Sequence, residues 1–110
     1  MRKATIEIKN KSYDLTLTRE SVIWLESMGF SVEDFQKKPV TYYEILWASA
    51  FIANHPEVNL NLALKLRESY KEEGGDVIEI INFIFEEYQS FIDALADTKS
   101  IKKKATITQI

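Results

Sequence analysis

Several ingredients of enzymes and metalloproteins are scarce or missing from this chain. Its 110 residues include no cysteine, one histidine, three glycines and two prolines. The lack of cysteine excludes a disulfide framework, a zinc ribbon and a thiol nucleophile, and His55 alone cannot form a histidine cluster for a metal. The glycines lack the spacing of a phosphate-binding loop, no HExxH occurs, and a Ser-His-Asp set would have to be built around His55 beside a proline. We therefore expect no enzyme, no metal site and no cofactor.

Long hydrophobic runs are also missing. The most apolar window, Tyr42 to Ala53, is shorter than the roughly 20 residues that a helix needs to cross a bilayer. The first residues alternate polar and apolar side chains, which is not the pattern of a signal peptide. The sequence thus predicts a cytoplasmic protein with no membrane partner.

Positive charge is scarce in most of the chain. Residues 1–97 carry 10 Lys and Arg against 17 Asp and Glu, whereas residues 98–110 carry four lysines and no acid. Because nucleic-acid binding depends on cations set against phosphates, an acidic body predicts no nucleic-acid partner. The acidic pair Glu86 and Glu87 is expected on a solvated helix face.

A period of two runs through residues 4–17, where apolar and polar side chains alternate. This pattern predicts a β-hairpin with a two-residue loop at Asn10 and Lys11, which would pair Ile8 with Tyr13. An isolated hairpin is only marginally stable in water, so its apolar face should rest on helices.

The rest of the chain shows helical periodicity with start and stop signals. Thr18, Thr41, Asn59 and Asp76 are expected to cap helices. A short turn should follow Ser31, and the predicted helices are 19–28, 42–54, 60–73 and 77–96. The fold class is therefore α+β and mostly helical, with an N-terminal β-hairpin packed on about four helices. Residues 1–97 should form a single domain, and residues 98–110 a basic tail that is flexible or adds an edge strand.

The predicted helix 42–54 is apolar around its whole circumference, so we expect it in the core or at a surface covered by a partner or a second copy. Two other aromatic residues lie off the apolar stripes of their helices. The candidate protein-binding residues are therefore Trp24, Tyr42, Tyr43, Trp47, Phe51 and Phe83.

The order of these elements and several short segments resemble the tail assembly chaperones of long-tailed bacteriophages. The resemblance covers about residues 4–96. It is carried by a hairpin with Asn10-Lys11-Ser12-Tyr13-Asp14-Leu15, a helix ending Leu25-Glu26-Ser27-Met28-Gly29, an apolar helix after Pro39, and Tyr70 to Gly74-Gly75-Asp76 before a last helix.

The resemblance implies a small helical protein, without catalytic residues, in the cytoplasm of the host. Its partners would be the tape measure protein, whose long hydrophobic helices it keeps soluble, and the tail-tube subunits. Two other functions stay open from the residues alone. An acidic inhibitor or nucleic-acid mimic would form a salt-sensitive complex with a DNA-binding protein, and a small enzyme would need a polar pocket near His55.

Overall fold

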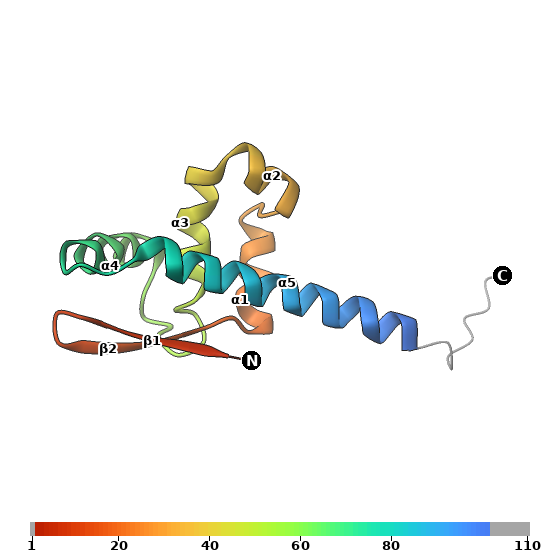
Figure 1. Ribbon diagram of the computed structural model, residues 1–110, viewed down its shortest axis with the longest axis horizontal. Helices are drawn as coiled ribbons and strands as arrows, with labels where there is room; N and C mark the ends of the chain where they lie inside the picture. The colour runs from red at the N-terminus through yellow and green to blue at the C-terminus, as the bar shows by residue number, and fades with distance from the viewer. Residues whose placement is uncertain (1, 102–110) are drawn as a thin grey trace.

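The protein is an antiparallel hairpin followed by helices, which confirms the α+β fold class. The computed structural model describes residues 2–101, with side chains as far as Leu95. Of the tail predicted at 98–110, residues 98–101 belong to the last helix and residues 102–110 lie outside the described residues. Figure 1 shows the hairpin along one side of the helices. The elements are β1 (Lys3–Ile8), β2 (Lys11–Thr16), α1 (Arg19–Ser27), α2 (Val32–Lys37), α3 (Pro39–Ser49), α4 (Leu60–Glu72) and α5 (Val77–Ile101).

The hairpin pairs in a register two residues away from the predicted one, so that prediction is wrong. Ile6, not Ile8, pairs with Tyr13, and the loop residues are Lys9 and Asn10, with φ of 50° and 66°. A shift of two residues keeps every side chain on its predicted face. The apolar side chains of the hairpin therefore still point into the core.

A residue from outside the hairpin contacts this loop. The backbone N–H of Lys9 donates to both carboxylate oxygens of Glu73, at 3.1 and 3.2 Å. On the outer face Thr5 lies opposite Asp14 and donates a hydrogen bond of 2.8 Å to it. The predicted register would instead have set the Glu7 carboxylate opposite that of Asp14, which is an unfavourable pairing.

The predicted caps of three helices are confirmed. The Thr18 side chain accepts a hydrogen bond from Ser21 at the start of α1. Asn59 accepts from the Leu62 N–H at 2.8 Å at the start of α4, and Asp76 accepts from the Glu79 N–H at 3.1 Å at the start of α5. Each cap satisfies a backbone donor that has no partner within the helix.

Helix α3 begins earlier and ends earlier than predicted. Its first residue is Pro39, and Lys38 precedes it with no side-chain cap, so the predicted cap at Thr41 is wrong. Proline suits the first helical position because its φ is fixed and it lacks the N–H that would be left unpaired. The helix ends at Ser49, and the Ala50 carbonyl then accepts a hydrogen bond from the Thr16 N–H at 3.2 Å.

The core is centred on α3, which contacts α1, α2, α4 and α5. The side chains of Ile45, Leu46 and Trp47 are buried, and the hairpin packs against the end of this segment through Tyr13, whose ring meets Phe51 edge to face. The all-round apolar helix thus lies in the core, one of its two predicted locations.

Helix α5 has two parts with different surroundings. Its first three turns bury Ile80, Ile81, Ile84 and Tyr88. The helix then continues to Ile101, past its predicted end at residue 96, and projects away from the rest of the molecule (Figure 1). The projecting part carries apolar side chains into partly open surroundings.

Candidate functional site

Two of the six candidate protein-binding residues lie inside the core. Trp47 and Phe51 are both 0% exposed. Trp47 also donates a hydrogen bond of 2.7 Å from Nε1 to the carbonyl oxygen of Ala63 in α4. These two side chains therefore stabilise the fold and offer no surface to a partner.

The two tyrosines at the start of α3 are half-buried. The hydroxyl of Tyr42 donates to the carbonyl oxygen of Gly29 at 3.2 Å, and its ring packs edge to face on Phe30. Tyr43 contacts the ring of Phe35 on one side and lines a pocket at the junction of α4 and α5 on the other. Only Tyr43 of this pair thus faces a hollow.

The remaining two candidates lie on different faces. Phe83 is half-buried beneath Arg2, whose guanidinium carbon is 5.1 Å from the ring centroid. This cation–π contact occupies one side of the ring. Trp24 is half-buried on α1 and lines an open hollow. The structure therefore does not gather the six candidates into one site.

A second group of apolar side chains, not selected from the sequence, is exposed on α1 and on the projecting part of α5. Ile23 and Met28 at α1 are 48% and 42% exposed, and Ile92 and Leu95 on the projecting part of α5 are 36% and 49% exposed. Ile23 lines two hollows, one of 290 Å³ against α5 and one of 660 Å³ against residues 48–60. We call the surface formed by Ile23, Trp24, Met28, Ile92 and Leu95 the α1–α5 apolar surface.

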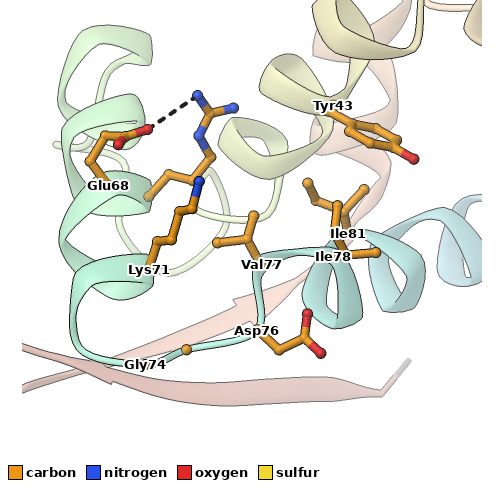
Figure 2. Close-up of a pocket in the computed structure, with 10 residues that line it drawn as sticks. Tyr43, Glu68, Lys71, Gly74, Asp76, Val77, Ile78 and Ile81 are labelled. Atoms are coloured by element: carbon orange, nitrogen blue, oxygen red, sulfur yellow. Dashed lines mark ion pairs between the residues drawn. The ribbon is translucent and has the colours of Figure 1, made fainter.

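The other prominent hollow is a pocket of 500 Å³ where α4 turns into α5, which we call the α4–α5 pocket. The cationic residues Arg67 and Lys71 line it on the α4 side, and Figure 2 shows Lys71 on α4 with Val77 and Ile78 on the α5 side. Tyr43 closes the far end. The pocket thus combines an apolar wall with a charged one.

The carboxylate of Glu87 has a partner at the other end of the sequence. Its Oε2 lies 2.9 Å from Arg2 Nε, its Oε1 accepts from the Arg2 backbone N–H at 3.1 Å, and the side chain is 8% exposed. The prediction of a solvated face is therefore wrong for Glu87, although Glu86 is 67% exposed. No local sequence signal identifies a partner 85 residues away.

His55 contacts two residues of the hairpin. Its Nε2 accepts a hydrogen bond from the Asp14 backbone N–H at 3.1 Å, and its ring centroid lies 5.0 Å from that of Tyr13. These two contacts attach His55 to strand β2. Within residues 2–101, no three His, Cys, Asp or Glu side chains are grouped closely enough to hold a metal ion.

None of the helices in this part of the chain is long and apolar enough to cross a membrane.

Comparison with known proteins gives one match. The model of a family described as "Domain of unknown function (DUF5055)" matches residues 2–109, almost the whole chain. No curated protein and no solved structure matches it.

Proposed function

The chain belongs to the DUF5055 family, and we propose that it acts as a tail assembly chaperone of a long-tailed bacteriophage, binding the tape measure protein and assisting assembly of the tail tube. The proposal combines the resemblance of residues 4–96 to those chaperones with a surface suited to a helical client. It needs no catalytic group, no metal and no cofactor.

The α1–α5 apolar surface is the observation that carries the proposal. A single exposed apolar side chain is common on any protein, but several large ones side by side mark an interaction surface. Here Ile23 of α1 adjoins Ile92 and Leu95 of α5 around one hollow. An amphipathic client helix would lay its apolar face into such a groove.

The shape of α5 supports the same function. Because α5 extends past the body of the protein (Figure 1), a long client could lie along its projecting part without meeting the hairpin. The acidic side chains of Glu20 and Glu26 line the hollows beside α1. Charged groups at the rim keep a complex with a hydrophobic client dispersed in water.

Co-expression with the tape measure protein encoded beside this gene tests the proposal. The complex should be recovered in the soluble fraction with the unaltered chain and lost with Leu95→Asp, which places a charge in the client groove. Ser90→Asp is the matched control, because it adds the same charge to an exposed position on the opposite side of α5.

Two results would contradict the proposal. One is a tape measure protein that stays equally soluble without this chain. The other is a gene whose neighbours include no tail-tube gene and no long tape measure gene. A complex formed instead with a DNA-binding protein and dissolved by salt would favour the acidic inhibitor.

A further inference from the structure

The α4–α5 pocket contains a guanidinium group, that of Arg67, which is poorly paired. The Arg67 side chain is 24% exposed, and its closest acidic partner is Glu68, with Arg67 Nη2 3.6 Å from Glu68 Oε1. This distance is too long for a good hydrogen bond, and no other polar partner of Arg67 lies among the described residues. The five donors of the guanidinium therefore remain available to a ligand in the pocket.

Lys71 lies one helical turn after Arg67 and lines the same pocket. Residues four apart share a face of a helix, so both cationic side chains line the pocket from the same side of α4. No acidic partner of Lys71 lies within the part of the chain that the structure describes. Two positive charges thus face one cavity in a protein whose net charge is −3.

The two acidic residues of the pocket do not neutralise this wall. Asp76 accepts the Glu79 backbone N–H at 3.1 Å as the cap of α5, and Figure 2 shows its carboxylate pointing away from Lys71. The Glu68 carboxylate is 61% exposed, so water screens its 3.6 Å pair with Arg67. A carboxylate entering the pocket would find the stronger partner in Arg67, which can bind both of its oxygens.

The opposite wall is apolar and continues outside the pocket. Val77, Ile78 and Ile81 form it on α5, and Ile78 is 47% exposed at the rim. On α3, Val40 is 74% exposed one turn before Tyr43, so apolar surface extends past the mouth on that side as well. A ligand that covered these side chains would need to be longer than the pocket itself.

We propose that the α4–α5 pocket binds an acidic amphipathic helix of a partner protein, with Arg67 and Lys71 holding one of its carboxylates while Tyr43 and Ile78 contact its apolar side chains. Charge complementarity identifies the carboxylate, and the exposed apolar rim favours a helix over a small organic acid. This inference rests on the proposed function only in taking a helical protein as the partner. The pocket is lined by the first residues of α5, whereas the α1–α5 apolar surface includes Ile92 and Leu95 further along the same helix.

Two synthetic helical peptides test the proposal by calorimetry and by amide chemical-shift mapping on the full chain. Both carry leucine along one face; one has glutamate beside that face and the other has glutamine at the same positions. The glutamate peptide should bind about tenfold more tightly, since a charge-assisted bond to arginine is lost with glutamine. Its shifts should map to α4 and the start of α5.

Variants of α4 supply the matched control. Arg67→Gln and Lys71→Gln should each remove most of the preference for glutamate, while Lys65→Gln removes the same charge from an exposed position outside the pocket and should leave it unchanged. Arg67→Lys should retain part of the preference, because it keeps the charge but loses the two-pronged hydrogen bonding. Thermal melts show that each variant is folded before affinities are compared.

Several outcomes would overturn the proposal. These are equal affinities for the two peptides, no binding of either peptide, or an unchanged preference in folded Arg67→Gln. Shifts confined to Ile23, Ile92 and Leu95 would also overturn it, because they would place the peptide on the α1–α5 apolar surface. That last result would leave the proposed chaperone function intact, so the two failures are distinguishable.

Discussion

The indole Nε1 of Trp47 lies 2.7 Å from the carbonyl oxygen of Ala63 and donates a hydrogen bond to it across the interface of α3 and α4. Both residues are 0% exposed. A buried indole N–H needs a partner, and this one has found it on the helix against which the ring packs. The largest core side chain is thereby fixed in one orientation, and the α3–α4 interface depends on it.

Replacement of Trp47 by Phe should therefore destabilise the protein strongly. The change removes the hydrogen bond and leaves part of the indole volume empty, which together should lower the free energy of unfolding by about 2–4 kcal/mol. Trp24→Phe is the matched control, because Trp24 is half-buried at an open hollow, and should cost under about 1 kcal/mol. Urea unfolding of both variants measures the difference, and equal losses would contradict the role of the buried bond.

Removal of the Arg2 side chain should destabilise the protein through Glu87. The Glu87 carboxylate is 8% exposed and, among the described residues, would keep only the Arg2 backbone N–H as a partner. A buried charge left without its partner is unfavourable, whereas an apolar replacement of both members can restore stability. Arg2→Ala should thus lower the denaturation midpoint, and the double variant with Glu87→Leu should recover it. A midpoint unchanged in Arg2→Ala would show that water replaces the guanidinium without cost.

Acid stability should depend on the hydrogen bond between Thr5 and Asp14. The Thr5 hydroxyl holds the pKa of Asp14 below its usual value, and Lys3, whose Nζ is 3.6 Å from Asp14 Oδ2, lowers it further. A carboxyl whose pKa is lower in the folded state stabilises the protein above its unfolded pKa of about 3.9, and this stability is lost as the pH falls through the folded value.

In Thr5→Val the pKa of Asp14 should therefore rise toward the unfolded value. Less stability should then be lost on acidification below about pH 4 than in the unaltered protein. Carboxyl chemical shifts recorded against pH measure the pKa directly. Lys9→Ala, which removes a charge elsewhere in the hairpin, should leave the pKa of Asp14 unchanged. An unshifted pKa of Asp14 in Thr5→Val would contradict the assignment of the Thr5 hydroxyl as the main cause.

The glycine pair between α4 and α5 should respond unequally to alanine. A Cβ at Gly75 would meet the ring of Tyr70, whereas a Cβ at Gly74 would meet open space. Gly75→Ala should cost about 1–3 kcal/mol through overpacking. Gly74 has φ of +90°, so Gly74→Ala should cost about 1 kcal/mol through backbone strain. Tyr70→Leu should rescue Gly75→Ala only, and rescue of both would contradict the separate causes.

Structural features that depend on neighbouring residues could be predicted from the sequence. A helix cap such as Asn59 depends on residues within one turn, and three of the four predicted caps are confirmed. The cap at Thr41 was wrong because Pro39 begins α3 two residues earlier. Alternation predicted the faces of the hairpin but not its register, because a shift of two residues leaves every side chain on the same face. The partner of Glu87 was missed because it lies 85 residues away in the chain.

The candidate site could be predicted only in part. Trp24 was selected because it lies off its helical stripe, and it does line an open hollow. Trp47 was selected because its helix is apolar all round, a pattern that a surface helix and a central helix share. Arg67 and Lys71 gave no signal, since two cations spaced by four residues are usual on a solvated helix; the pocket beside them exists only after α5 folds back.

The two-part environment of α5 has a consequence for how the α1–α5 apolar surface forms. A helix is costly to nucleate, and short isolated helices are marginal in water, but each residue added to an existing helix brings its own backbone hydrogen bond. The packed turns from Val77 to Tyr88 supply the nucleus, and the turns that carry Ile92 and Leu95 only have to propagate from it. Any substitution that loosens the first turns of α5 would therefore unwind a client surface it does not touch.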